Sequence, residues 1–167
     1  MTASSLAAHI FSAAESREWF KPLPGEHIAM RVETRHTGGA FSLTEIIVEP
    51  QSGPPLHIHT DADEVLYVLE GTVDFIAGDE QFRTGAGGFA AIPRGMPHAF
   101  RNFEAQPARM LVMLTPGGFE QFMPAMRGRA LSEVPMLARQ FGMEIVGPPI
   151  AAPAGTPPQE AMVPQEA

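Results

Sequence analysis

The sequence predicts an all-β protein: one small β-barrel followed by a helical extension. Two observations predict this fold class. Many short apolar runs are separated by turn signals, and the 167 residues include 16 glycines and 17 prolines, more than the usual share. Hydrophobic residues make up 44% of the chain, which is ample for the core of a single domain. The length excludes a second barrel.

Nine apolar segments are predicted to be strands, because each is bounded by residues that favour turns. They cover residues 27–35, 41–49, 56–59, 65–69, 72–77, 80–83, 89–92, 99–103 and 109–114. The sequences Thr37-Gly38-Gly39 and Pro93-Arg94-Gly95 are examples of the turn signals between them. These segments place the barrel within residues 21–116.

The regions outside the barrel have other patterns. Residues 1–20 are predicted to form a short helix or an arm, and residues 117–147 a helical extension. In the extension, apolar side chains recur at helical intervals, at Phe119, Phe122, Met123 and Met126, and Ser132 is a candidate N-cap of a second helix. Such a methionine-rich segment usually fills a core or an interface. Residues 148–167 are rich in proline and predict a flexible tail.

Three histidines and a glutamate have a spacing that suits a metal site. His57 and His59 are two residues apart in a predicted strand, so both can face inward. Glu64 follows a polar connection, residues 60–63, of the right length for a hairpin loop, so it is expected to fold back beside them. His98 precedes a later strand and can join the group if the sheet closes into a barrel.

These residues belong to two longer motifs that resemble those of the cupin family. The first motif, H-x-H-x(3,4)-E-x6-G, is matched by His57, His59, Glu64 and Gly71. The second, G-x5-P-x-G-x2-H-x3-N, is matched at every fixed position, by Gly87, Pro93, Gly95, His98 and Asn102. The family's first motif usually opens with a glycine five residues before the first histidine, whereas here Gly53 leaves only three residues between.

The cupin resemblance covers roughly residues 27–115 and implies a small barrel of the jelly-roll type. It also implies one divalent transition metal ion bound by His57, His59, Glu64 and His98. Three imidazoles and a carboxylate leave a net charge of +1 on such an ion and positions open for water, oxygen or a substrate. Fe, Mn, Ni, Co, Cu and Zn all suit these ligands, so the sequence does not name the metal. Glu64 is also a candidate catalytic base, through a carboxylate oxygen that the metal does not use.

Residues 54–71, together with an extension that begins near Gly118, are similar to single-domain bacterial cupins related to quercetin 2,3-dioxygenase. This similarity implies a metal-dependent dioxygenase that cleaves an aromatic or enolic small molecule, such as a flavonol, and inserts both atoms of oxygen. Leu66 and Val68 share a strand face with Glu64, and Phe100 shares one with His98, so these three are candidate pocket residues as well as ordinary barrel packing.

Two other classes of function stay open, because one fold hosts unrelated chemistries. The chain is either such a dioxygenase, a non-redox metal-dependent isomerase or decarboxylase, or a small-molecule-binding cupin without turnover. Activity without oxygen and with zinc would indicate the second class.

The charge and composition indicate which partners to expect. A net charge of −8 with a single lysine argues against binding to nucleic acid or anionic membranes, so a small-molecule substrate is expected. The sequence has no long apolar span, no secretory signal pattern and no cysteine, and we expect a cytoplasmic protein. The cupin resemblance also implies a homodimer.

Overall fold

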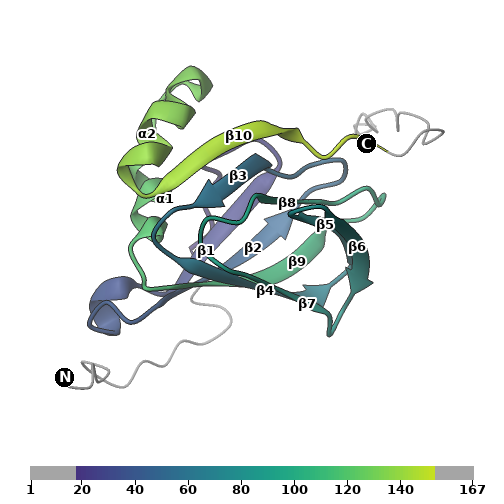
Figure 1. Ribbon diagram of the computed structural model, residues 1–167, viewed down its shortest axis with the longest axis horizontal. Coiled ribbons are helices and arrows are strands. Elements are labelled where there is room, and N and C mark those ends of the chain that lie inside the picture. Colours follow the sequence, from purple (N-terminus) through teal and green to yellow (C-terminus); the bar gives the residue numbers. More distant parts are fainter. Residues whose placement is uncertain (1–17, 153–167) are drawn as a thin grey trace, which may run out of the picture.

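Two five-stranded antiparallel sheets form the fold of residues 18–152, the part of the chain that the computed structural model describes (Figure 1). The first sheet has the strand order β1 (Glu26–Val32), β2 (Ser42–Val48), β9 (Ala108–Thr115), β4 (Asp63–Glu70) and β7 (Phe89–Ile92). The second has the order β10 (Met143–Pro149), β3 (Pro55–His59), β8 (His98–Arg101), β5 (Thr72–Ala77) and β6 (Glu80–Gly85). The predicted all-β barrel with C-terminal helices is confirmed.

The core lies between the sheets because side chains alternate along each strand. In β9, Ala108, Met110, Val112 and Leu114 are buried and the residues between them are more exposed. Inward side chains of β5 and β8, such as Phe75 and Phe100, belong to the same buried cluster. All nine predicted strands occur, with ends that differ by a few residues, and a short 3-10 helix (Thr34–His36) replaces the end of the first.

The prediction that β3 and β4 form a hairpin through residues 60–63 is wrong. β3 pairs with β8 and β10, whereas β4 pairs with β7 and β9. Both edges of each strand are therefore occupied by other partners, and residues 60–62 carry the chain from one sheet to the other. As a result Glu64 approaches the histidines from the opposite sheet.

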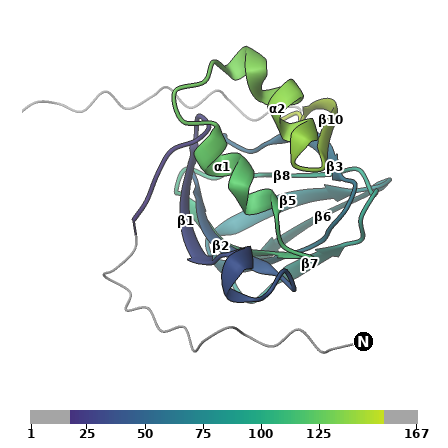
Figure 2. The same cartoon turned by 90° about the vertical axis from the view of Figure 1, so that its left-hand side faces the viewer.

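The helical extension lies at one end of the barrel (Figure 2). It consists of two 3-10 helices, Phe119–Gln121 and Leu131–Glu133, and two α-helices, α1 (Phe122–Ala125) and α2 (Val134–Gln140). Its buried side chains pack with Met143 of β10 in a second apolar cluster, which contains Phe122, Met126, Val134 and Ala138. No helix within residues 18–152 is both long enough and apolar enough to cross a membrane.

The sequence analysis did not predict β10. This strand lies where we expected the end of the helical extension and the start of the proline-rich tail, and it pairs with β3 through Met143 opposite His59 and Ile145 opposite His57. The pairing becomes irregular before Pro149, as expected for prolines in a strand at the edge of a sheet. The tail beyond residue 152 and the arm over residues 1–17 lie outside the described residues.

Candidate metal centre

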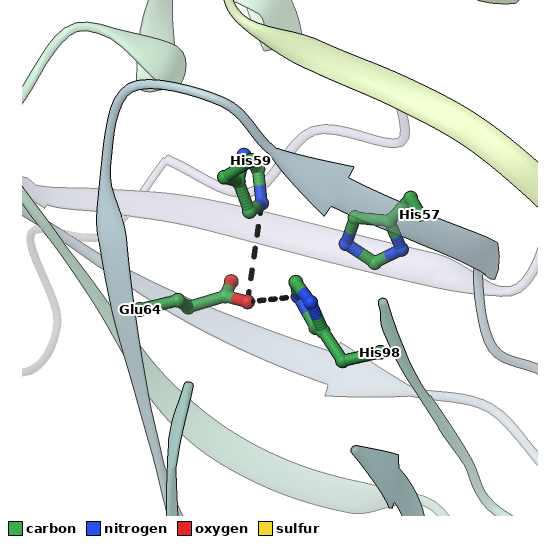
Figure 3. Close-up of side chains that lie close together, drawn as sticks. All are labelled: His57, His59, Glu64 and His98. Atoms are coloured by element: carbon green, nitrogen blue, oxygen red, sulfur yellow. Dashed lines mark hydrogen bonds and ion pairs between the residues drawn. The ribbon is translucent and has the colours of Figure 1, made fainter. Parts of the chain in front are cut away.

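Four buried side chains meet inside the barrel (Figure 3). His57 and His59 come from β3, His98 begins β8, and Glu64 lies in β4 of the opposite sheet. One nitrogen or oxygen atom from each side chain lies within 4.8 Å of the others. The structure therefore brings together all four residues that the sequence predicted as metal ligands.

The backbone explains why the three imidazoles converge. His57 and His59 face the same way because they are two residues apart in β3. His57 is the residue of β3 that pairs with His98 across the β3–β8 ladder, and the two ring centres are 4.3 Å apart. Sheet pairing thus sets the distance between imidazoles that are 41 positions apart in the sequence.

Backbone carbonyl groups orient two of the imidazoles. His57 Nδ1 lies 2.8 Å from the carbonyl oxygen of Pro55, and His98 Nδ1 lies 2.9 Å from that of Met96. A carbonyl oxygen only accepts hydrogen bonds, so each Nδ1 carries the proton and donates it. In His57 the lone pair then sits on Nε2, as is usual for histidines that bind metal ions, whereas Nε2 of His98 faces Glu64 and also carries a proton.

Glu64 is ionised at neutral pH. Its Oε2 atom lies 2.6 Å from His98 Nε2 and 3.9 Å from His59 Nε2. Burial raises the pKa of Glu64, but the hydrogen bond from His98 and the charges of the three imidazoles lower it by more, to about 2. Burial lowers the pKa of His98, yet the hydrogen bond and charge of Glu64 outweigh this effect and raise it.

The other two histidines are neutral. Burial, together with the charge of His98, lowers the pKa of His57 to about 3, and burial also lowers the pKa of His59. Two neutral imidazoles and a carboxylate are ready to bind a cation, and the proton shared by His98 and Glu64 is the one that a cation would displace. The donor set fits one divalent transition metal ion.

An apolar cavity of about 80 Å³ adjoins this centre. His57, His59 and Glu64 line it on one side. The extension supplies Phe119, Phe122, Met123 and Val134 to its wall, and the barrel supplies mainly aliphatic side chains. We expected the extension to fill a core or an interface, so its part in the cavity wall is a finding of the structure.

Of the three predicted pocket residues, only Phe100 lines the cavity. Leu66 and Val68 do not: they are 1% and 0% exposed and belong to the core cluster between the sheets. They do share the inward face with Glu64, but the barrel interior extends beyond the cavity, and there opposing side chains fill it. For Leu66 and Val68 the structure agrees with ordinary barrel packing, the alternative that the sequence also indicated.

Two further motif residues have structural roles. Asn102 is fully buried: its Nδ2 donates to the carbonyl oxygens of Val48 and Gln106, at 3.0 and 2.8 Å, and its Oδ1 accepts from the backbone of Glu104. Gly53 lies so close to β8 that a Cβ atom would stand 2.1 Å from the carbonyl oxygen of Phe100. Both residues hold the strands that carry the ligands.

Comparison with known proteins agrees with this geometry. The family described as "Cupin domain" matches residues 44–114. A relative from Bacillus subtilis (strain 168), a quercetin 2,3-dioxygenase, is 33% identical over 67 residues. That match covers 40% of this chain, and this chain spans only 20% of the length of the relative.

Solved structures with the same fold include two from bacteria. The polyketide cyclase RemF from Streptomyces resistomycificus is 25% identical, with a TM-score of 0.57 over 65% of this chain and 80% of the cyclase. An RmlC-like cupin from Shewanella frigidimarina has a TM-score of 0.60 at 17% identity, over 68% of this chain and 96% of that protein. Its two motifs, its two-sheet barrel and this match over residues 44–114 make the chain similar to cupins, and among them to the quercetinase-like members.

Proposed function

We propose that this protein is a metal-dependent enzyme that acts on a small enolic or aromatic molecule, and that it is a dioxygenase. The observation that carries the proposal is the cluster of three histidines and Glu64 beside a largely apolar cavity, which His57, His59 and Glu64 line. The similarity to a quercetin 2,3-dioxygenase supports the choice of reaction. The substrate class follows from the cavity, which would accept an apolar body with one polar end.

The residues of the centre have separate roles in this proposal. His57, His59, His98 and Glu64 would hold one divalent ion, which supplies a Lewis acid and, if it is redox-active, a route for electrons between substrate and oxygen. Only Oε2 of Glu64 has partners within the described residues. Its Oε1 atom could therefore take the proton of a substrate hydroxyl, which makes Glu64 the proposed catalytic base.

The cavity wall would exclude water from the reacting group. Apolar surroundings strengthen the attraction between a cation and a substrate oxyanion. The free space of about 80 Å³ is smaller than the roughly 150 Å³ of an engineered cavity that binds benzene. A flavonol would need movement of the partly buried Phe119 and Met123, so a single-ring enol or a diketone is the better first substrate to test.

A non-redox reaction is the second candidate. The RemF polyketide cyclase covers 65% of this chain, against 40% for the quercetin dioxygenase. A cyclase, isomerase or decarboxylase could use the same ligands and cavity, with the ion acting only as a Lewis acid. Binding without turnover is the third outcome.

Metal analysis combined with an oxygen electrode separates these candidates. Protein is loaded in turn with Fe, Mn, Ni, Co, Cu and Zn, its metal content is measured, and each form is given benzoylacetone or 3-hydroxyflavone. Oxygen uptake with a redox-active metal, and none with zinc, would support the dioxygenase. Substrate loss without oxygen uptake would favour the second candidate. The Glu64→Gln variant tests the base, because full turnover in a variant that retains its metal would rule out that role.

The proposal includes a cytoplasmic homodimer with a small molecule as its partner. Tyr67 and Phe89 face each other across the β4–β7 ladder and are 43% and 64% exposed. Adjacent exposed aromatic side chains are common where two proteins meet. Light scattering of wild type and of a Phe89→Ser variant tests the dimer, which should weaken in the variant.

A further inference from the structure

A second carboxyl group reaches the cavity outside the metal centre. Glu26 begins β1, and its side chain is among those that line the cavity. Glu26 and Ile28 are both inward residues of this strand, and Glu26 is only 6% exposed. In the first sheet β2 and β9 stand between β1 and β4, so Glu26 and Glu64 reach the cavity from strands that are not neighbours.

The carboxyl group of Glu26 has no hydrogen-bond partner among residues 18–152, although its backbone N–H donates to Leu23. The third glutamate of the cavity differs: Glu120 accepts hydrogen bonds from the backbone N–H groups of Thr34 and Gly118. No lysine or arginine in the described residues lines the cavity. The oxygens of this carboxyl group are not among the fully buried atoms without a partner in residues 18–152, so they are accessible from the cavity, where a ligand can supply the missing hydrogen bond.

The surroundings of Glu26 favour its neutral form. Burial, and then the negative charge of Glu64, raise the pKa of Glu26 to about 7. A protonated carboxyl group carries one O–H donor, whereas a carboxylate only accepts. Near neutral pH a substantial part of the protein therefore presents a donor to the cavity.

We propose that Glu26 is a specificity-determining residue, which donates a hydrogen bond to a neutral oxygen on the part of the ligand that lies away from the metal centre. The ligand class is then defined at both ends. One end is an enol or hydroxyl that binds at the histidine cluster, the middle is apolar, and the far end has a carbonyl or hydroxyl oxygen. This inference rests on the proposed function in one respect, that one end of the ligand binds at the metal centre. It does not depend on which reaction follows.

The same arrangement selects against anionic ligands. A carboxylate at the far end of the ligand would leave water for an apolar wall in which the described residues include no lysine or arginine to pair with it. The cost of burying that charge exceeds what one hydrogen bond from Glu26 returns. Dicarboxylates and other doubly anionic substrates are therefore outside the proposed class.

Three matched probes test the inference. They are benzoylacetones with a para substituent that is acetyl, isopropyl or carboxylate. Acetyl and isopropyl have nearly the same shape, but only acetyl accepts a hydrogen bond. Dissociation constants are measured by calorimetry at pH 6 on zinc-loaded protein, in which oxygen chemistry cannot interfere. We expect wild type to bind the acetyl probe about tenfold more tightly than the isopropyl probe, and the carboxylate probe most weakly.

Two variants and a control assign the effect to this side chain. Glu26→Leu should lose the preference for acetyl and bind the isopropyl probe at least as well as wild type does. Glu26→Gln keeps a hydrogen-bond donor at this position, so it should keep the preference for acetyl. Glu80→Gln makes the same change in charge at an exposed residue of β6 and should match wild type. Circular dichroism checks that each variant is folded.

The results separate this inference from the proposed reaction. Equal binding of acetyl and isopropyl by wild type, an acetyl preference that survives in Glu26→Leu, or no binding of any probe would overturn the role of Glu26. A preference for acetyl that disappears only in Glu26→Leu supports it, even if no metal form consumes oxygen. Oxygen uptake by a protein that shows no preference among the probes would support the dioxygenase reaction and contradict the proposed role of Glu26.

Discussion

Two carboxyl groups of one cavity are in opposite states because their neighbours differ. Glu64 has three imidazoles around it, which lower its pKa to about 2, whereas Glu26 has no cation and an anionic neighbour, and its pKa rises to about 7. Such a separation of pKa values assigns the roles of hydrogen-bond acceptor and donor. It also makes the stability of the protein depend on pH.

Replacing Glu26 with glutamine should remove part of this pH dependence. The pKa of Glu26 is about 7 in the folded protein, above its ordinary value of 4.5, so folding favours the protonated form. The stabilisation is fully present below pH 4.5 and is lost as the pH rises through 7. Between pH 5 and pH 8 wild type should lose about 2.5 kcal/mol relative to Glu26→Gln. Urea denaturation of both proteins at the two pH values measures this, and parallel curves would contradict it.

Removal of one imidazole should weaken metal binding strongly. His57→Ala leaves two histidines and Glu64, and we expect zinc affinity to fall at least about 100-fold, since loss of a group that merely orients a ligand costs up to that much. The control is His27→Gln, which changes a histidine that is paired with Glu49 instead of facing the centre. Competition with a chromogenic chelator measures both affinities. Equal affinity in the two variants would remove His57 from the ligand set.

At this scale the sequence predicted the ligands but not Glu26. The ligands occur in fixed motifs, and their types and spacings are visible in the chain. Glu26 is a single charged residue at the start of a strand, where an exposed position is the ordinary expectation. Its burial is a result of the tertiary fold, because Leu23 and side chains of the extension line the same cavity.

Among the elements, β3 depends on a close contact just before it begins. A Cβ atom at Gly53 would lie 2.1 Å from the carbonyl oxygen of Phe100 and 2.9 Å from the Cα atom of Arg101, both of them backbone atoms of β8. β3 and β8 carry three of the four candidate ligands. Any separation of these strands therefore acts on the metal centre as well as on the fold.

Replacing Gly53 with alanine should thus have two effects. We expect the free energy of unfolding to fall by about 1–3 kcal/mol, because backbone must move to admit the methyl group, and zinc affinity to fall as His57 and His98 move apart. Gly85→Ala in β6 is the control, because the nearest atom to its Cβ would be an ordinary contact at 3.5 Å. Urea denaturation and chelator competition measure both effects. If Gly53→Ala had the same stability and zinc affinity as Gly85→Ala, the close approach of Gly53 to β8 would have no part in either.

The sequence predicted those strands that have a run of apolar residues between two turn signals. Nine of the ten within residues 18–152 have apolar runs with clear turn signals. β10 contains Gly147, Pro148 and Pro149, which by composition indicate a loop. It becomes a strand because the outer edge of β3 is open for pairing, and that edge is set by the topology of the sheets. The pairing of β4 with β7 and β9 is equally non-local, which is why the predicted hairpin failed.

Considered as a whole, the molecule has a candidate metal centre that joins its two sheets. The three histidines belong to the second sheet and Glu64 to the first, so a bound ion would cross-link the barrel through its interior. An ion that binds the folded state alone stabilises it by an amount that depends on its concentration relative to Kd. The centre is therefore coupled to global unfolding, not only to the local order of β3.

Zinc should raise the free energy of unfolding by about 4 kcal/mol at a free concentration about 1,000 times its Kd. In His57→Ala, at the same zinc concentration, a Kd weakened about 100-fold leaves a gain of only about 1.4 kcal/mol. Urea denaturation of each protein, with zinc and with a chelator, measures the two gains. A large gain for wild type and a small one for His57→Ala would place the ion between the sheets. Equal gains would mean that zinc binds elsewhere on the folded chain, and the proposed centre would then be wrong.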